Sequence, residues 1–284
     1  MQWLLSKKSL PYKHWEFLNI ESNDRLRIVP ERGGLITSWL CNGKEILYFD
    51  ENRFADKSKS IRGGIPVLFP ICGDLPGNIL TLAKGNFKIN QHGFVRDLPW
   101  KIALLNDQVG FSLSINSSQS TIKHYPYDFK IEMHVLPSSS SLCIHSFIYN
   151  NGVEVMPFSL GLHPYFKVNN LQKLSIKGMP SRCFNHTNKK YELTNKQLAS
   201  MDSGVDFLVE NNDFIDINDL SNNSKITLKA KPPMNLAVVW TDPPRNMVCL
   251  EPWTSPRNSL NTGERSLFVK PGNVQELYCK FLIH

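Results

Sequence analysis

The chain has 284 residues, of which 41% are hydrophobic and 20% are charged, and its formal net charge is +7. This hydrophobic fraction supports a sizeable core and excludes an intrinsically disordered chain. Nucleic-acid binding would need clustered basic residues, and here they are scattered; a small anionic substrate fits the positive charge as well, and the charge alone decides neither. We expect no nucleic-acid partner. We expect one domain over residues 1–284, because all-β chains of this length often form a single unit.

No apolar run approaches the roughly 20 residues of a transmembrane helix. The apolar start of the chain is interrupted by Lys7 and Lys8, unlike a secretory signal. Six cysteines are present without a C-x-x-C pair, which predicts reduced thiols and no metal site. We therefore expect a cytoplasmic protein without membrane contact, either a monomer or a weak homodimer.

In chain order, the first expected strands cover residues 14–20 and 24–30. Asn42-Gly43 predicts a hairpin between strands at 35–41 and 45–49, because both residues tolerate positive φ. The next stretch, 62–100, is rich in proline and glycine. It is unsuited to a helix and predicts strand ends and shaped loops.

From there to the end of the chain, apolar and polar residues alternate with period two. Successive strand side chains point to opposite faces, so this pattern over 109–115 predicts a strand with one buried face. The serines at 138–141 predict a hairpin tip. The polar stretch 185–225 predicts a mobile excursion, and within it residues 195–201 predict a turn or two of helix. Further strands are expected at 101–106, 129–135, 142–149, 153–161, 173–178, 225–230, 236–241, 247–251, 265–270 and 277–283. The pattern predicts an all-β fold, a large antiparallel β-sandwich with very little helix.

Two motifs in residues 62–100 set polar side chains among large apolar ones. The first is Arg-Gly-Gly-Ile-Pro-x-x-Phe-Pro from Arg62 to Pro70. The second is Gln-His-Gly-Phe-x-Arg-x-Leu-Pro-Trp from Gln91 to Trp100. By themselves they also fit a loop-rich connection with surface arginines. Together they resemble the aldose 1-epimerase family, and more narrowly its hexose-6-phosphate 1-epimerase branch, which implies a β-sandwich of many strands.

Two further segments carry the resemblance. His163 follows an apolar strand in a His-Pro-Tyr-Phe segment, and Glu251 follows another in Glu-Pro-Trp. An imidazole titrates near neutral pH, and a partly desolvated carboxyl has a raised pKa, so each suits proton transfer. A structural histidine and an exposed glutamate fit the local sequence as well. In the family, these segments carry the general acid and the general base, which implies His163 and Glu251 as the catalytic residues.

The resemblance also implies which residues bind the substrate. The two arginines match the phosphate-handling branch, and a guanidinium group binds phosphate oxygens bidentately. His92 is expected to hold a sugar hydroxyl or the charge that develops on ring opening. Asp206, equally well a turn aspartate, would bind hydroxyls, and Trp253 would stack on the sugar ring. The full set is Arg62, Gln91, His92, Arg96, Asp206 and Trp253.

The sequence departs from the family pattern at two places. Asn185 stands where relatives often carry an aspartate, which leaves the preference among sugars open. Ile71-Cys72 stands where many bacterial relatives have Trp-Phe, which would alter the pocket wall.

The function expected from this resemblance is interconversion of the α and β anomers of a hexose 6-phosphate, with glucose 6-phosphate as the first candidate. Glu251, as carboxylate, would take the proton of the O1 hydroxyl, and protonated His163 would give one to the ring oxygen O5. Such chemistry needs no metal or redox cofactor. Three alternatives remain: a non-catalytic carbohydrate-binding protein, an epimerase of unphosphorylated aldoses, and a glycoside-processing enzyme that uses Asp206 and Glu251.

Overall fold

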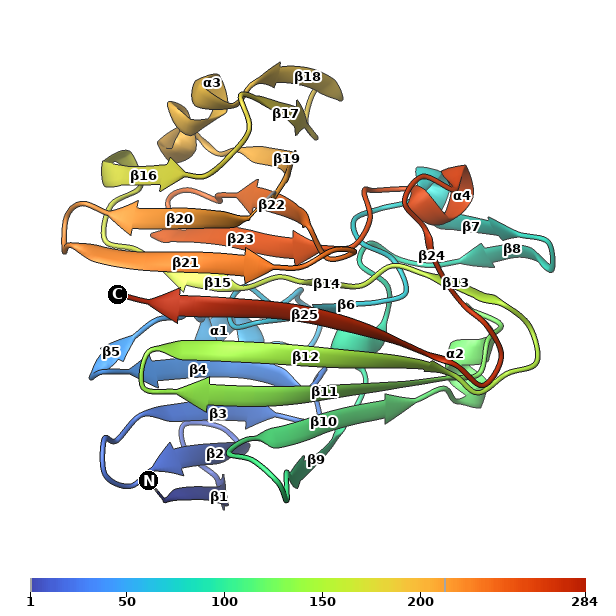
Figure 1. Cartoon of the computed structure of the whole chain (residues 1–284), viewed down its shortest axis with the longest axis horizontal. Coiled ribbons are helices and arrows are strands. Elements are labelled where there is room, and N and C mark those ends of the chain that lie inside the picture. The colour runs from blue at the N-terminus through green and yellow to red at the C-terminus, as the bar shows by residue number, and fades with distance from the viewer. Residues whose placement is uncertain (1, 212) are drawn as a thin grey trace.

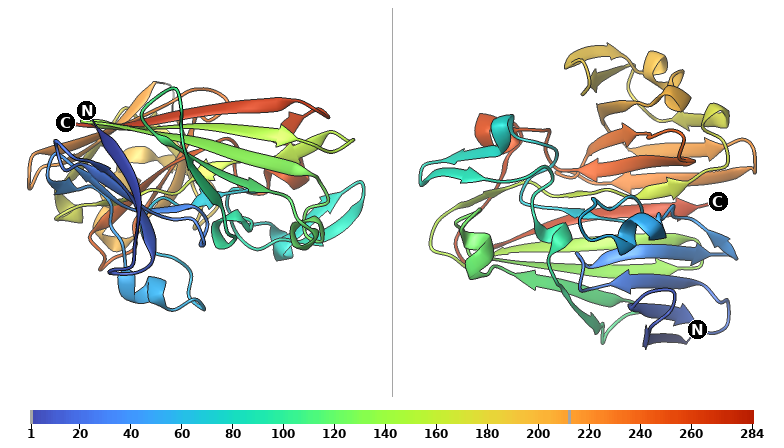
Figure 2. Two further views of the ribbon diagram at one scale, coloured as in Figure 1. Left: turned by 90° about the horizontal axis from the view of Figure 1, so that it is seen from below. Right: turned by 180° about the vertical axis from the view of Figure 1, so that it is seen from behind.

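The computed structural model describes residues 2–211 and 213–284, and its β-sheets pack face to face (Figures 1 and 2). The front layer in Figure 1 is an antiparallel sheet of eight strands in the order β16-β20-β21-β25-β12-β11-β10-β9. Its strands are β9 (Lys101–Leu104), β10 (Phe111–Asn116), β11 (Phe129–Ser138), β12 (Ser141–Asn150), β16 (Leu174–Lys177), β20 (Phe214–Asp219), β21 (Ser224–Ala230) and β25 (Val274–Ile283).

Two further sheets lie behind this layer. A five-stranded sheet contains β1 (Trp3–Lys8), β2 (His14–Asn19), β3 (Arg25–Val29), β4 (Leu35–Cys41) and β5 (Lys44–Glu45). The other runs in the order β18-β17-β19-β22-β23-β14-β6, with β15 paired to β23. Its strands are β6 (Val67–Leu68), β14 (Gly161–Leu162), β15 (Tyr165–Lys167), β17 (Arg182–Asn185), β18 (Lys190–Leu193), β19 (Asp206–Glu210), β22 (Leu236–Trp240) and β23 (Met247–Trp253).

Shorter hairpins and helices lie outside these three sheets. The hairpin of β7 (Ile79–Leu82) and β8 (Gly85–Lys88) projects beside α4, and β13 (Met156–Phe158) pairs with β24 (Leu267–Val269) (Figure 1). The α-helices are α1 (Glu51–Ala55), α2 (Gln119–Ile122), α3 (Thr194–Leu198) and α4 (Ser259–Thr262), and the 3-10 helices are η1 (Pro76–Asn78), η2 (Val95–Asp97), η3 (Leu171–Lys173) and η4 (Met201–Ser203). None of the helices in the described ranges has the length and apolar character of a membrane span.

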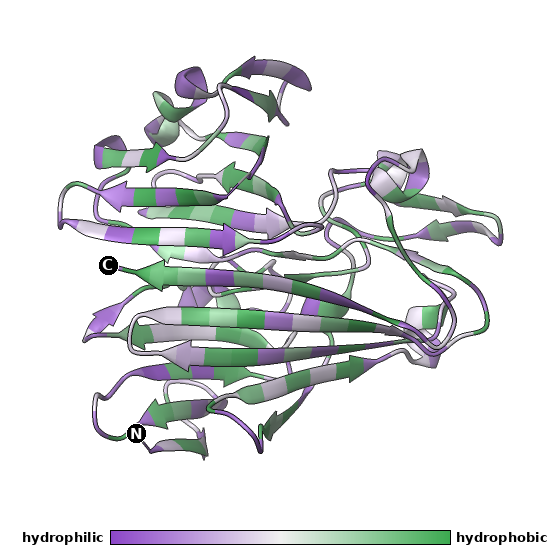
Figure 3. Ribbon diagram, in the orientation of Figure 1, coloured by the Kyte–Doolittle hydropathy of each residue, from purple (hydrophilic) through white to green (hydrophobic). Residues whose placement is uncertain are grey.

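The main core fills the space between the layers. Along β11, Phe129, Ile131 and Met133 are buried while the residues between them are partly exposed, and Figure 3 shows this alternation in colour. From the layer behind, Val239 of β22 and Leu250 of β23 join the same core cluster. Burial of one face of each strand is therefore the main source of stability, as the period-two pattern predicts.

The structure confirms the all-β antiparallel architecture, the scarcity of helix, and the hairpins at 42–43 and 138–141. The predicted excursion at 185–225 is wrong, since this stretch supplies β18, α3, β19 and β20. Its strands alternate too, but polar residues flank them on both sides and hide the pattern. The predicted strand at 153–161 is also wrong, because β13 and β14 there belong to different sheets. Strands β1, β15 and β17 and the β7–β8 hairpin were not predicted from the sequence.

Candidate active site

Strand β23 carries polar residues on the face turned away from the main core. Val248 and Leu250 belong to the main core, while Cys249 and Trp253 belong to two smaller clusters on the opposite side. Because side chains alternate along a strand, Glu251 shares the face of Cys249 and Trp253. A pocket of about 250 Å³ opens over this face, and it is lined by Ser60, Arg62, Gln91, His92, Arg96, His163, Tyr165, Asp206, Val238, Trp240, Glu251, Trp253 and Arg257. All eight site residues predicted from the sequence line this one pocket.

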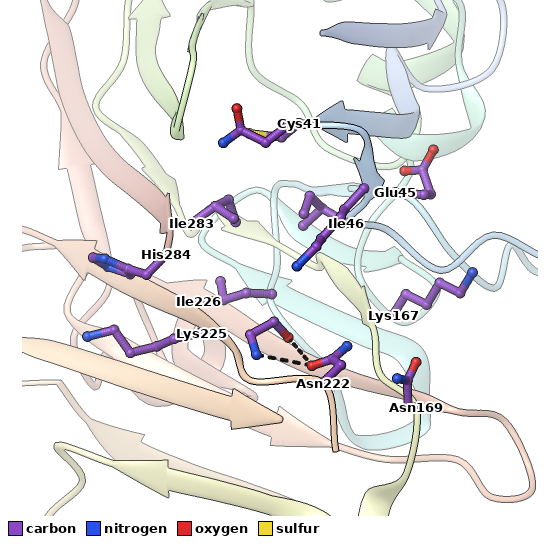
Figure 4. Close-up of a pocket in the computed structure, with 13 residues that line it drawn as sticks. Cys41, Glu45, Ile46, Lys167, Asn169, Asn222, Lys225, Ile226, Ile283 and His284 are labelled. Atoms are coloured by element: carbon purple, nitrogen blue, oxygen red, sulfur yellow. Dashed lines mark hydrogen bonds between the residues drawn. The ribbon is translucent and has the colours of Figure 1, made fainter. Parts of the chain in front are cut away.

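A larger pocket of about 350 Å³ lies elsewhere, between the β4–β5 turn and strands β21 and β25 (Figure 4). Lysines 44, 167 and 225 surround an apolar floor there, and Glu45 is its acidic residue. The Glu45 carboxylate already accepts hydrogen bonds from the Ser38 hydroxyl and from the backbone N–H groups of Trp39 and Leu47. Size therefore does not identify the chemical site, because no free acid–base pair faces this larger pocket.

Glu251 and His163 meet at the floor of the smaller pocket. Glu251 Oε1 lies 3.4 Å from His163 Nε2, and Glu251 Oε2 accepts a hydrogen bond of 3.1 Å from the Trp253 indole N–H. His163 lies between β14 and β15, where its backbone N–H donates to the carbonyl of Pro66 and its ring stacks on Tyr165. The carboxyl is 2% exposed and the histidine 8% exposed, so both are held in fixed positions out of bulk water. Glu251 lies within β23 rather than at the strand end that the sequence suggested.

Burial controls the protonation of this pair. Desolvation, with the nearby charge of Asp206, raises the pKa of Glu251 well above its usual value. Desolvation also lowers the pKa of His163 to about 3, and the charges of Arg96 and Arg62 act in the same direction. Burial therefore favours a neutral pair with the proton on Glu251. The sequence predicts the ionised pair instead, with Glu251 as carboxylate and His163 protonated. This pair has the same number of protons as the neutral pair, and transfer of one proton from Glu251 to His163 converts one into the other.

His92 is held as a neutral hydrogen-bond donor. Its backbone N–H donates to the carbonyl of Gly73, and the N–H of Gly73 donates to His92 Nδ1 at 3.1 Å. Burial keeps the pKa of His92 well below its usual value. With Nδ1 accepting, the proton of the neutral ring resides on Nε2, which can donate to a ligand. The next residue must be glycine, because a Cβ on Gly93 would lie 1.9 Å from the carbonyl oxygen of Phe69.

Asp206 is held as an ionised acceptor between two partners. Its Oδ1 lies 2.6 Å from His186 Nδ1, and its Oδ2 lies 2.7 Å from Arg257 Nη2. Burial alone would raise the pKa of Asp206, but the hydrogen bond and charge of His186, with the charge of Arg257, bring it below its usual value. The His186 ring in turn stacks on Trp253. A connected network thus joins Asp206 to the indole that binds Glu251.

Two further arginines lie at the opposite rim. Arg62 packs its guanidinium over the Trp240 ring at 5.3 Å, and its Nε lies 3.5 Å from Asp242. Arg96 Nη2 donates to the carbonyl of Gln91 at 2.9 Å. The Asp97 carboxylate is 3.9 Å from Arg96 Nε, which makes this ion pair a weak one. Within the described ranges, Arg62 Nη2 and Arg96 Nη1 have no protein partner, which leaves them available to an anion.

The sequence analysis did not select several of these residues. Tyr165 was detectable, because it lies two positions after His163 in an extended segment and so shares its face. Trp240 has no local signal that separates it from a core tryptophan, and its pairing opposite Cys249 brings it to the pocket. Arg257 and His186 gave no local signal, because their common partner Asp206 is distant in the sequence.

The two departures from the family pattern lie outside the pocket lining. The Asn185 amide donates to Glu192 at 3.2 Å rather than facing the pocket. Ile71 and Cys72 are both buried, and Cys72 packs in a cluster with Trp253. None of these three residues therefore lines the pocket.

The fold and the pocket define a β-sandwich protein with a buried acid–base pair beneath a polar, arginine-rimmed site. The chain belongs to the aldose 1-epimerase family, whose model matches residues 18–281. The Slr1438 protein from Synechocystis sp. PCC 6803 has a similar crystal structure, with a TM-score of 0.90 and 33% identity over 95% of both chains. A galactose mutarotase-like protein from Clostridium acetobutylicum shares the fold, with a TM-score of 0.80 and 18% identity over 99% of this chain and 98% of that one.

Curated relatives match over part of the chain. A Cenchrus ciliaris protein named "Putative glucose-6-phosphate 1-epimerase" is 30% identical over 161 residues, which cover 52% of this chain and 45% of the relative. An Escherichia coli (strain K12) protein of the same name is 27% identical over 165 residues, which cover 57% of this chain and 51% of the relative. The chain thus spans about half the length of the curated relatives it matches. The family resemblance noted in the sequence is confirmed.

Proposed function

We propose that this protein interconverts the α and β anomers of a hexose 6-phosphate, with His163 and Glu251 as the proton-transferring pair. The observation that carries the proposal is the buried pair at 3.4 Å in the same pocket as two arginines with unpartnered N–H groups. The names of the curated relatives support glucose 6-phosphate as the first substrate to test.

Substrate binding would prepare the pair for catalysis. The positive charges of Arg62 and Arg96 disfavour the imidazolium form of His163 in the empty pocket. A phosphate bound between these arginines offsets their charges and so favours transfer of the proton from Glu251 to His163. The bound state then has a carboxylate base and an imidazolium acid side by side.

The reaction uses these two groups in both directions. Glu251 takes the proton of the O1 hydroxyl, the O1 electrons form the carbonyl, and the C1–O5 bond breaks as His163 protonates O5. Rotation about the C1–C2 bond then presents the other face of the aldehyde. Ring closure returns the O5 proton to His163 and the Glu251 proton to O1. A positioned acid and base each contribute about 10²–10⁴-fold.

His92 and Asp206 would hold the sugar during this cycle. The Nε2–H of neutral His92 can donate to a sugar oxygen near the bond that breaks, and ionised Asp206 can accept from sugar hydroxyls. Trp253, expected from the sequence to stack on the sugar, is 1% exposed and already stacks on His186, so it offers no free face to the ring; it holds Glu251 through its indole N–H instead. These roles require no change in the protonation of either residue.

The test is an anomer-interconversion assay on glucose 6-phosphate and on glucose, with wild type, Arg62→Ala and Arg96→Ala. Charge-assisted hydrogen bonds contribute about 1.5–3 kcal/mol each, so either substitution should lower kcat/KM for the phosphorylated sugar about 10- to 100-fold. Free glucose lacks this contact, and its turnover should hardly change.

The same assay separates the alternatives. A wild-type ratio of efficiencies near one would indicate an epimerase of unphosphorylated aldoses. Sugar binding without turnover would indicate a carbohydrate-binding protein. Hydrolysis of a glycoside would support the third alternative, although Asp206 is already engaged by His186 and Arg257.

A further inference from the structure

Arg257 makes two ion pairs with acids from different parts of the chain. Its Nη2 lies 2.7 Å from Asp206 Oδ2, and its Nη1 lies 2.9 Å from Asp74 Oδ1. Both terminal nitrogens are therefore committed to carboxylates. Its Nε is buried and has no hydrogen-bond partner among the residues described. These contacts distinguish it from Arg62 and Arg96, which meet Asp242 and Asp97 only loosely through Nε, at 3.5 and 3.9 Å.

The stem of Arg257 packs on the turn that holds His92. A Cβ on Gly73 would lie 2.2 Å from the Arg257 Cγ, and Gly73 has a φ of +73°, so this position admits the arginine stem only as glycine. The backbone of Gly73 bonds His92 at two points, through the ring Nδ1 and through the main-chain N–H. The Arg257 side chain thus contacts both the hydrogen-bond acceptor Asp206 and the turn that positions the donor His92.

We propose that Arg257 is a positioning residue that fixes Asp206 and the Gly73–His92 turn for the sugar ring. It thereby acts on recognition of the sugar and not of the phosphate. This inference rests on the proposed function, because it assigns Asp206 and His92 to the sugar. The reason is geometric: the planar guanidinium holds two acids at once, and its stem packs where a Cβ on Gly73 would stand.

The first experiment measures kcat and KM for glucose 6-phosphate and glucose in wild type and Arg257→Met, which keeps an unbranched stem without charge. We expect kcat/KM to fall about 10- to 100-fold for both sugars, mostly through KM, with their ratio unchanged. Arg257→Lys should recover part of the loss, because one ammonium group can still reach Asp206. Asp74→Asn is the matched control, since it loosens only the outer ion pair, and we expect less than about a 3-fold change.

The second experiment is a double-mutant cycle with Asp206→Asn. If Arg257 acts through Asp206, Arg257→Met should add little once the carboxylate is gone, so the combined loss should be far below the product of the single losses. Fully multiplicative losses would overturn the inference. So would a selective loss of the phosphorylated substrate, which would make Arg257 a phosphate ligand.

A failure of the proposed function remains distinguishable. If the wild type shows no preference for glucose 6-phosphate, the cycle is measured on glucose and tests the same coupling. If no turnover is found, calorimetric Kd values for glucose 6-phosphate and glucose replace KM in the same cycle. Thermal unfolding of each variant identifies misfolding, and Arg257→Lys then serves as the charged variant that keeps the stem. Equal Kd values in wild type and a folded Arg257→Met would also overturn the inference.

Discussion

The two faces of β23 are equally buried and serve opposite purposes. On the core face, Val248 and Leu250 are fully buried among apolar side chains. On the pocket face, Glu251 is 2% exposed, and its neighbours are His163 and Trp253. The exclusion of water stabilises the fold on the first face. On the second, it shifts the pKa of a carboxyl and makes it available for proton exchange.

The difference teaches that burial by itself does not identify a core residue in this fold. Most polar groups on the pocket face are tolerated because they have partners: Glu251 accepts from Trp253, Asp206 pairs with His186 and Arg257, and His92 bonds Gly73. Among the described residues, His163 Nδ1 and Arg257 Nε are buried there without a hydrogen-bond partner. The core face has no such partners, so a polar residue there would only destabilise. Substitutions on the two faces should therefore separate activity from stability.

The largest effect should come from Glu251→Gln on the pocket face. The amide keeps the shape of the side chain and cannot accept the O1 proton, so we expect kcat to fall about 10²–10⁴-fold. Sugar binding and thermal stability should change little, because a neutral glutamic acid and a glutamine are similar in size and charge. Steady-state kinetics with calorimetric binding would measure both. Turnover near the wild-type level in a folded variant would contradict the assignment of the base.

The matched substitution on the core face is Leu250→Ala, one residue away. Removing this buried side chain should lower the free energy of unfolding by about 2–5 kcal/mol, through lost burial and the cavity left behind. The rate per folded molecule should stay within a few-fold of wild type, because Leu250 points away from the pocket. Denaturant unfolding with active-site titration checks this. A loss of turnover as large as that of Glu251→Gln would mean that the faces are not independent.

An intermediate effect is expected in the pH dependence of stability. Burial lowers the pKa of His163 to about 3 in the folded protein, below the ordinary value of 6.5. The contribution of this neutral histidine is therefore fully present above pH 6.5 and is lost as the pH falls toward 3. Glu251 behaves oppositely, because its raised pKa stabilises the fold below its ordinary pKa of 4.5 and that contribution is lost as the pH rises.

The comparison of wild type with His163→Asn isolates the contribution of His163 to the pH dependence of stability. Denaturant unfolding at pH 7.5 and pH 5 should show a larger loss of stability on acidification in the wild type, since asparagine binds no proton. His92 remains in both proteins and cancels in the difference. An identical pH dependence in the two proteins would mean that folding does not shift the pKa of His163.

The smallest effect is expected from Asn185→Asp, which restores the residue that relatives often carry. Asn185 donates to Glu192 and does not line the pocket, so the new carboxylate would face another one instead. We expect a loss of about 1 kcal/mol in unfolding free energy and no change in the relative kcat/KM for glucose and galactose 6-phosphates. A changed sugar preference would show that the pocket senses this side chain after all.

Much of the architecture and of the site was predictable because it depends on local patterns. The alternation of residues along strands depends on the two-residue period of an extended chain, so the β-sandwich was predictable from 109–115 and similar stretches. The polar side chains in the motifs at 62–100, 163 and 251 stood out against their apolar surroundings. Six of them line one pocket, although nothing local showed how close they lie: Arg62, Gln91, His92, Arg96, His163 and Glu251.

Only the tertiary structure decided which residues far apart in the chain contact each other and which side chains are shielded from water. Arg257 reaches Asp206 because of how β19 and the segment after β23 lie in space, and no spacing in the sequence encodes that contact. The protonation of Glu251 and His163 likewise follows from desolvation, a property of the surrounding atoms rather than of the residue type. The amino-acid sequence by itself thus determined which side chains were available for chemistry, and the fold decided their partners and their charges.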